Sequence, residues 1–392
     1  MGYNVAMKKI IAGLTAAAVL TLTALCACKK SEKESYYSTF YAMDTAARLY
    51  AADVDKNDFQ ALSDKVGELL SAAENSLSTS RSNSYISEYN RAAAGATVVI
   101  DEICYEVLTL AKDVYTVTDG SFNPAVYYCE DIYGFAARPA SAGSMPYDRS
   151  GEDWTLPEDK YVTAFKELAD HFAEVEIFEL HGTYYATKPE FTVSVEGDDN
   201  VYSLALDLGG IAKGWCVDRV DELMAEAGIE YGYFNFGESS MSVKKYLGGD
   251  NYYSVAAGDP RNTGSAYVSF KMQNSNLSTS GDNHRYYELD GTRYCHIIDP
   301  HTGSPIQTGV ASVTVVGGSA GRFDALTTAL SAMDMQSAAE FINGNMTDGK
   351  VVMLYVENGA GRVLTNAPEY FKIENNNYTL ANTVEDGRIV LN

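Results

Sequence analysis

The chain has 392 residues and a formal net charge of −24 at pH 7, from 53 acidic and 29 basic side chains. This excess of acidic residues argues against nucleic acid or an anionic membrane surface as the partner. Beyond the N-terminal region the cysteines are widely spaced, without a Cys-x-x-Cys pair, which excludes a zinc signature: Cys104, Cys129, Cys216 and Cys295.

The N-terminal region resembles a bacterial export signal. Lys8 and Lys9 precede an uncharged run at 10–25, which is too short to span a bilayer comfortably once processing is allowed for. The run ends in Leu25-Cys26-Ala27-Cys28, which resembles a lipobox. We therefore expect a signal peptide over 1–28 and a lipid on Cys28 that anchors the protein to the extracytoplasmic face of the cell membrane. The alternatives are a plain secretory signal with incidental cysteines, or a buried helix.

Residues 29–38 are interpreted as a flexible tether between the lipid and the folded part. The folded domain is expected over 39–392. Because this length exceeds a usual single core of roughly 250–300 residues, one large unit with insertions and two closely packed lobes are both compatible with it.

In the first half of the chain, apolar residues at three- and four-residue spacings predict helices at 58–77 and 102–116. The polar stretch 78–91 between them is expected to be a loop. Residues 137–156 are rich in Ala, Ser, Gly and Pro and indicate a surface insertion. Strands at 174–180 and 183–186 are expected to form a hairpin through a turn at His181-Gly182.

The second half alternates strand and helix, which predicts a mixed α/β fold, a sheet with helices packed on it. The expected strands are 202–208, 231–236, 310–316 and 351–356, and the expected helices are 213–227 and 322–333.

The strongest local pattern is a strand that ends in Asp207 and runs through Gly209 and Gly210 into a helix. Paired glycines let successive N–H groups converge, and a helix N-terminus favours negative charge, so a phosphate would be favoured here. Lys213 would add a full positive charge in the first turn. The alternative is a tight strand-to-helix turn with an exposed lysine.

Asp324 and Thr328 stand four residues apart at a helix start and project from the same face. A carboxylate and a hydroxyl with few other acids would suit Mg²⁺, which keeps waters and shares substrate phosphates. The alternative is an aspartate favoured by the helix dipole beside a packed threonine.

His296 follows a strand end and precedes Ile297, Ile298 and Asp299. An imidazole titrates near neutral pH, so His296 is a candidate general base. A satisfied structural histidine is the alternative.

Together these segments resemble the motifs of the ApbE flavin transferases, the FAD:protein FMN transferases, over nearly the whole chain after Thr39. The matching segments are Met43-Asp44-Thr45, Ser84 to Asn90, Thr118 to Pro124, Asp207 to Gly214, Thr279 to Asp282, His296 to Gly303 and Asp324 to Leu330. The resemblance implies an ApbE-like, T-fold-related sheet with packed helices.

The resemblance also implies roles at single positions. The FAD site would include Met43, Ser121, Phe122, Asn123, Asp207, Lys213 and Ile298. Asp324, Thr328 and the carbonyl of Gly210 would hold Mg²⁺, and His296 would take the proton from the acceptor hydroxyl. The implied reaction is transfer of FMN from FAD to a Ser or Thr of an exported redox protein carrying an Asp-Gly-x-Thr or Asp-Gly-x-Ser type motif, with release of AMP. An FAD pyrophosphatase and a non-catalytic flavin-binding lipoprotein are the competing hypotheses.

The sequence departs from the family pattern at several positions. Asp44 replaces a glycine, Asn123 replaces an aspartate, and Ser80 stands where many members have an aromatic residue. None of these changes removes the expected metal ligands or His296.

Overall fold

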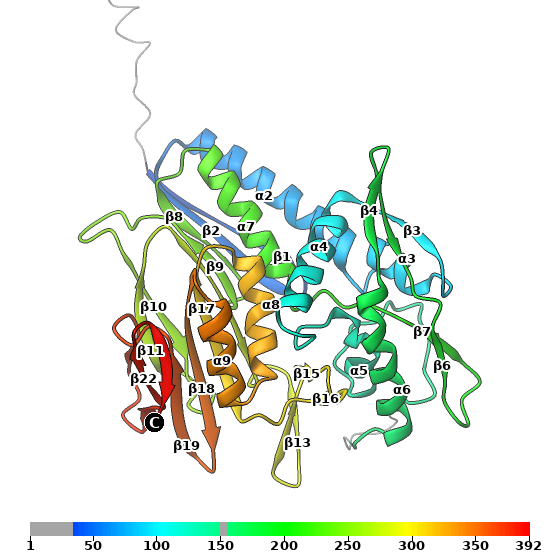
Figure 1. The fold of residues 1–392 in the computed structure, drawn as a ribbon. Coiled ribbons are helices and arrows are strands. Elements are labelled where there is room, and N and C mark those ends of the chain that lie inside the picture. The colour runs from blue at the N-terminus through cyan, green and yellow to red at the C-terminus, as the bar shows by residue number, and fades with distance from the viewer. Residues whose placement is uncertain (1–33, 149–154) are drawn as a thin grey trace, which may run out of the picture.

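A computed structural model describes residues 34–148 and 155–392 (Figure 1). The expected mixed α/β fold is confirmed, because helices cover one face of a nine-stranded sheet with strand order β1-β2-β8-β9-β12-β17-β18-β19-β21. Neighbouring strands in this sheet are antiparallel, apart from the parallel pair β19 and β21. The strands are β1 Glu34–Ala42, β2 Thr45–Val54, β8 Tyr231–Phe236, β9 Ser240–Val243, β12 Ser275–Gly281, β17 Val310–Gly317, β18 Gly349–Glu357, β19 Ala360–Thr365 and β21 Tyr378–Leu380.

Four helices lie across one face of this sheet (Figure 1): α2 Lys56–Leu77, α7 Ala212–Glu226, α8 Ala320–Ser331 and α9 Met335–Asn345. Their apolar residues recur at helical spacing, so each helix turns one buried stripe toward the strands. The helices predicted at 58–77, 213–227 and 322–333 are therefore confirmed, with starts one or two residues earlier.

On the opposite face a smaller sheet packs against the C-terminal strands. It consists of β10 Tyr253–Gly258, β11 Ala266–Met272 and β20 Lys372–Ile373. Tyr267 and Phe371 from this layer share a core with Val352 and Leu354 of β18. Both faces of the central strands are thus buried, which explains why β17 is buried without alternation from Val310 to Val316.

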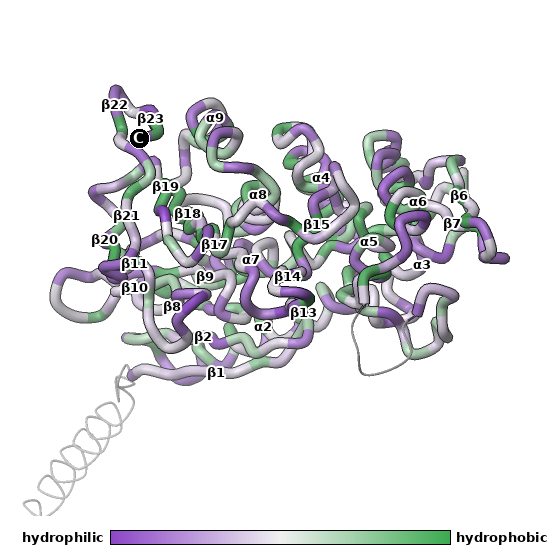
Figure 2. The backbone as a smooth tube through the Cα atoms, turned by 90° about the horizontal axis from the view of Figure 1, so that it is seen from below, coloured by the Kyte–Doolittle hydropathy of each residue, from purple (hydrophilic) through white to green (hydrophobic). Residues whose placement is uncertain are grey.

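A second group of elements forms one end of the molecule, and the β10–β11 layer lies toward the other end (Figure 2). The second group consists of α3 Tyr85–Arg91, β3 Thr97–Ile100, α4 Glu102–Val117, α5 Tyr127–Ile132, α6 Asp159–Asp170, β4 Ile177–Leu180, β5 Thr183–Thr187, β6 Thr192–Ser194 and β7 Val201–Ser203, with 3₁₀ turns at Pro124–Val126 and His171–Glu174. The hairpin through His181 and Gly182 is confirmed, with both residues at positive φ.

Three short hairpins complete the described chain. These are β13 Tyr286–Leu289 with β14 Thr292–Cys295, β15 Ile298–Asp299 with β16 Ser304–Pro305, and β22 Asn382–Glu385 with β23 Arg388–Leu391. The described part of the predicted insertion, 137–148, contains no helix or strand.

Three expectations need correction. Residues 34–38 belong to β1 and pair with β2, so they are not a tether. The loop predicted at 78–91 contains α3, which Ser84 caps by accepting a hydrogen bond from the N–H of Ser87. The strand predicted at 202–208 ends at Ser203, because the following residues are bonded to α3 and to the Pro124 carbonyl rather than to another strand.

The predicted signal peptide, lipidated Cys28 and residues 29–33 of the tether lie outside the described residues. Within 34–148 and 155–392, no helix is both long and apolar enough to cross a bilayer.

Candidate active site

Helices α7 and α8 approach closely at Gly214. The N–H of Gly214 donates to Asp324 Oδ2 at 2.9 Å. A Cβ at Gly214 would lie against the Ala320 carbonyl and 2.7 Å from the Asp324 Cβ. Glycine is therefore required here by the contact that positions the candidate metal carboxylate.

Asp218, one turn further along α7, fixes the start of α8. Its carboxylate accepts hydrogen bonds from Ser319 Oγ at 2.6 Å, the Ala320 N–H at 2.6 Å and the Gly321 N–H at 2.9 Å. These bonds satisfy N–H groups that an α-helix leaves without partners at its N-terminus. The position of Asp324 along α8 is thus tied to α7 twice.

Two of the three candidate metal residues, Gly210 and Thr328, lie side by side in the structure. A Cβ at Gly210 would lie 3.3 Å from Thr328 Oγ1 and 3.4 Å from a ring carbon of Phe122. Asp324 lies one helical turn before Thr328, whose hydroxyl donates to the Asp324 carbonyl at 3.2 Å. A carboxylate, a hydroxyl and a main-chain carbonyl are hard oxygen donors of the kind that Mg²⁺ accepts.

Burial raises the pKa of Asp324, and the positive charge of Lys213 opposes that effect. A buried carboxylate of this kind is stabilised by a nearby cation. The described residues contain no group of three or more His, Cys, Asp or Glu side chains that could hold a metal. The candidate Mg²⁺ ligands at Gly210, Asp324 and Thr328 include only one carboxylate.

Asp207 and Lys213 flank the glycine turn. Asp207 Oδ1 accepts the Gly209 N–H at 2.6 Å, and Lys213 Nζ donates to the Gly209 carbonyl at 3.2 Å. Burial raises the pKa of Asp207, while the Gly209 N–H and the charges of Arg285 and Lys213 lower it. The predicted turn therefore places an acid and a base at one end of α7.

The segment before α5 carries three of the predicted flavin-site residues. Ser121 Oγ lies 3.3 Å from His301 Nε2, which joins this segment to the His296–Gly303 motif. Phe122 is buried beside Gly210. Asn123 makes internal bonds, because Oδ1 accepts the Ala125 N–H and Nδ2 donates to the Ala169 carbonyl, each at 2.9 Å. Its side chain thus caps the 3₁₀ turn at Pro124–Val126.

His296 follows β14, and its ring lies at the edge of the Phe135 ring with centroids 6.5 Å apart. Its Nδ1 is buried and has no hydrogen-bond partner among the described residues. Burial lowers the pKa of His296 to about 4, and the charges of Arg285, Lys213 and His284 act in the same direction. The imidazole is therefore neutral at pH 7.

The hairpin that carries His296 is anchored on that same side by Phe135. The Phe135 carbonyl accepts a hydrogen bond from the Arg285 guanidinium, and the centroids of the Phe135 and Tyr287 rings are 5.4 Å apart. The main-chain carbonyl of Arg285 also accepts a hydrogen bond from the His296 N–H at 3.0 Å. Arg285, Tyr287 and His296 alternate along paired strands and so share a face.

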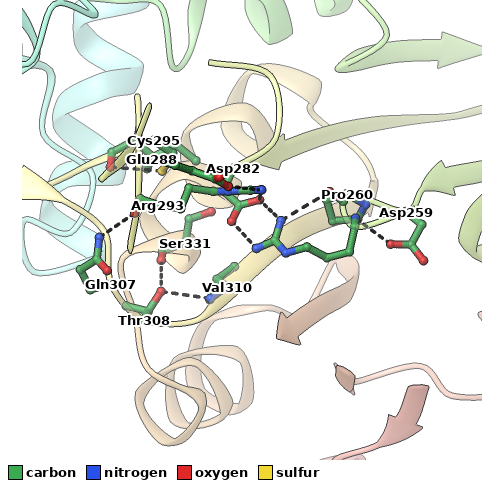
Figure 3. Close-up of polar contacts among 12 residues, drawn as sticks. Asp259, Pro260, Asp282, Glu288, Arg293, Cys295, Gln307, Thr308, Val310 and Ser331 are labelled. Atoms are coloured by element: carbon green, nitrogen blue, oxygen red, sulfur yellow. Dashed lines mark hydrogen bonds and ion pairs between the residues drawn. The ribbon is translucent and has the colours of Figure 1, made fainter. Parts of the chain in front are cut away.

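The opposite face of the hairpin carries an ion-pair cluster (Figure 3). Arg261 binds Asp282 through two bonds of 2.6 and 2.5 Å, and Arg293 lies 3.6 Å from the same carboxylate. Both carboxylate oxygens of Asp282 are thus occupied by arginine side chains. Asp299 likewise accepts the His301 N–H at 2.9 Å.

A family model described as "ApbE family" matches residues 43–353. The chain belongs to the ApbE family. Two curated relatives are named "FAD:protein FMN transferase". The protein of Klebsiella pneumoniae is 25% identical over 329 residues, covering 84% of this chain and 86% of its own, and that of Haemophilus influenzae is 27% identical over 346 residues, covering 86% and 91%.

Solved structures agree with this family assignment at the level of the fold. "Flavin Transferase ApbE from Vibrio cholerae" superposes with a TM-score of 0.67 and 22% identity, covering 85% of this chain and 97% of its own. The apo form of Pseudomonas stutzeri flavinyl transferase ApbE gives a TM-score of 0.68 and 21% identity, with 86% and 96% covered.

Met43 and Ile298, also predicted for the flavin site, lie in the β1–β2 turn and in β15. Met43 occupies the β1–β2 turn at φ 49°, and its N–H donates to Glu74 Oε1 at 3.0 Å. Asp44 follows at φ 58°, a conformation that suits the glycine of the family pattern and that aspartate tolerates. Ile298 is buried in β15, opposite Pro305.

Sequence reasoning missed Glu130, Phe135 and Arg285. Burial raises the pKa of Glu130 well above its ordinary value, the Asp207 charge adds to this, and Arg285 opposes it. A single acid on a six-residue helix leaves no periodic pattern in the sequence. Arg285 could have been suspected from its place between two motifs, Thr279–Asp282 and His296–Gly303.

Proposed function

We propose that the chain is an FAD:protein FMN transferase that moves FMN from FAD to a Ser or Thr hydroxyl of an exported acceptor protein and releases AMP. The observation that carries this proposal is His296. Its half-buried imidazole is neutral at pH 7, its Nδ1 has no partner among the described residues, and the charges of Arg285 and Lys213 act on it. The names of the relatives supply the reaction class.

The phosphates of FAD would bind at the glycine turn. Gly209 and Gly210 precede the N-terminus of α7, and Lys213 stands in its first turn. Glycine N–H groups and a helix N-terminus favour an anion. Asp324, Thr328 and the Gly210 carbonyl would hold Mg²⁺, which when bound offsets negative charge on the pyrophosphate oxygens.

The chain's own residues then account for the proton and the charge. His296 takes the proton of the acceptor hydroxyl, whose oxygen forms a bond to the FMN-side phosphorus. The bond from that phosphorus to the bridging oxygen breaks, and the oxygen leaves with AMP. Lys213 and Arg285 offset the negative charge that spreads over the phosphoryl oxygens. A well-placed base contributes roughly 10²- to 10⁴-fold to such a step.

The experiment is incubation of the purified chain with FAD, Mg²⁺ and a synthetic peptide containing Asp-Gly-Ala-Thr, followed by mass spectrometry. We expect the peptide to gain one FMN and AMP to appear in equal amount. The matched control is the same peptide with Val in place of Thr, which should gain nothing. Release of free FMN without peptide modification would instead identify an FAD pyrophosphatase, and intact bound FAD a flavin-binding protein.

Membrane anchoring through Cys28 belongs to the same proposal. Because β1 starts at Glu34, a lipid at Cys28 would hold the domain close to the membrane surface. Replacement of Cys28 by Ala should release the protein from the membrane fraction, whereas Cys26→Ala should leave it there. Equal membrane retention of the two variants would contradict the anchor.

A further inference from the structure

The β13–β14 hairpin has a strand pairing that can be assigned residue by residue. Asp290 and Gly291 form its two-residue turn at φ 50° and 79°, so the flanking pair Leu289 and Thr292 is hydrogen-bonded. Hydrogen-bonded pairs alternate along an antiparallel ladder. Counting back from Leu289 and Thr292, Arg285 and His296 should again form a hydrogen-bonded pair. The His296 N–H does donate to the Arg285 carbonyl, at 3.0 Å.

The main-chain groups of Tyr286 and Glu288 therefore point away from β14, along the outer edge of β13. The corresponding outward carbonyl on β14, that of Arg293, accepts Gln307 Nε2 at 3.0 Å (Figure 3). Over 34–148 and 155–392, no hydrogen bond reaches the N–H or carbonyl groups of Tyr286 and Glu288. The Tyr286 side chain is 41% exposed. The edge of β13 is thus open to another strand within the described structure.

Side chains hold this edge in place. The Arg293 guanidinium lies 4.0 Å from the centre of the Tyr286 ring, whereas its 3.1 Å ion pair with the exposed Glu288 carboxylate adds little. On the other face, Phe135 packs on Tyr287. An edge that is ordered before binding loses little entropy when a partner pairs with it.

We propose that the outer edge of β13 is the docking strand for the acceptor protein, whose modified segment adds as an extended third strand. This inference rests on the proposed function. Continuity with His296 favours the acceptor as the occupant, because the ladder that exposes Tyr286 continues to Arg285 and His296. An added strand would lie two strand spacings, about 10 Å, from the strand that leads to His296. Its hydroxyl could reach the imidazole as the segment leaves the ladder past Arg285.

This docking mode relies on main-chain bonds, which any sequence can make except at proline. It fits an acceptor whose Ser or Thr lies in an exposed, extended segment. Side chains at alternate positions of that segment would face the Arg293 side and the Phe135 side of the hairpin.

The test compares Glu288→Pro with Glu288→Ala. Proline removes the outward N–H and is tolerated at a sheet edge, whereas alanine keeps the N–H and removes only the carboxylate. With FAD, Mg²⁺ and the Asp-Gly-Ala-Thr peptide as probe, we expect the peptide KM to rise at least about tenfold in Glu288→Pro and to stay within twofold in Glu288→Ala. FAD binding by flavin fluorescence and the melting temperature should match the parent in both variants.

A second measurement needs no variant of the enzyme. Peptides N-methylated at one residue each should lose transfer at alternate positions near the Thr, because every second N–H of an added strand bonds β13. Equal KM for the two Glu288 variants, or no alternation in the methylated series, would overturn the docking assignment. A parent enzyme that leaves every peptide unmodified would overturn the proposed function itself.

Discussion

On the α7–α8 side of the site, residues are positioned by main-chain groups, whereas the His296 hairpin is positioned by side chains from distant parts of the chain. Gly214 contacts Asp324 through its own N–H, and Asp218 binds the first N–H groups of α8. His296 lies beside the Phe135 ring, which comes from a distant segment, and the Arg285 side chain of its own hairpin bonds the Phe135 carbonyl. A substitution that separates α7 from α8 should therefore abolish activity, whereas substitutions around the His296 hairpin should lower it by degrees.

The largest effect is expected for Gly214→Ala. The added methyl would meet the Ala320 carbonyl and the Asp324 Cβ, so the two helices must separate. Overpacking typically costs about 1–3 kcal/mol, and a clash with backbone lies at or above that range. We expect loss of FAD cleavage and a lower denaturation midpoint in urea. Gly344→Ala, where a Cβ in α9 meets nothing within 4 Å, is the control and should keep both.

Asp324→Asn should remove catalysis while keeping the fold. The amide oxygen can still accept the Gly214 N–H, but the charge that would hold Mg²⁺ is gone. We expect FAD cleavage to fall by about 10²-fold or more. The melting temperature without Mg²⁺ should equal or exceed that of the parent, because a buried carboxylate is replaced by a neutral group. Retention of Mg²⁺-dependent activity in this variant would remove Asp324 from the metal site.

Phe135→Leu should have a smaller effect on the other side of the site. The ring that borders both His296 and Tyr287 is lost, while the Phe135 carbonyl that binds Arg285 remains. We expect transfer to drop by roughly tenfold in kcat, with FAD binding within a few-fold of the parent. Phe178→Leu, which removes a ring stacked on Tyr185 in β4–β5, is the matched control. Equal kcat values would show that Phe135 does not position His296.

A separate prediction concerns the pH dependence of stability. The pKa of His296 is lowered from 6.5 to about 4, so between these values the unfolded chain binds a proton that the folded chain does not. The stabilising contribution is therefore complete above pH 6.5 and is lost as the pH falls toward 4, by up to about 3 kcal/mol. Urea unfolding of the parent and of His296→Gln should diverge over this window. His181→Asn, in an exposed turn, should follow the parent.

The same contrast explains what the sequence could predict. The glycine turn and the Asp324–Thr328 spacing are local patterns, so both were expected, and the structure places Gly210 beside Thr328. Phe135, Arg285 and Glu130 act on the site from other segments, and no local periodicity marks such contacts. The bonds from Asn90 to Leu206, which end the strand predicted at 202–208, join residues 116 positions apart. No local sequence pattern could predict them.

In the proposed reaction, His296 supplies the base for transfer without contributing to FAD binding. The most direct measurement compares the parent with His296→Gln for melting temperature, FAD affinity by flavin fluorescence, and mass gain of FMN on the Asp-Gly-Ala-Thr peptide. We predict FAD affinity within a few-fold and an unimpaired melting temperature at pH 7, with transfer lowered by about 10²-fold or more. Undiminished transfer, or a parallel loss of FAD binding and stability, would contradict this role of His296.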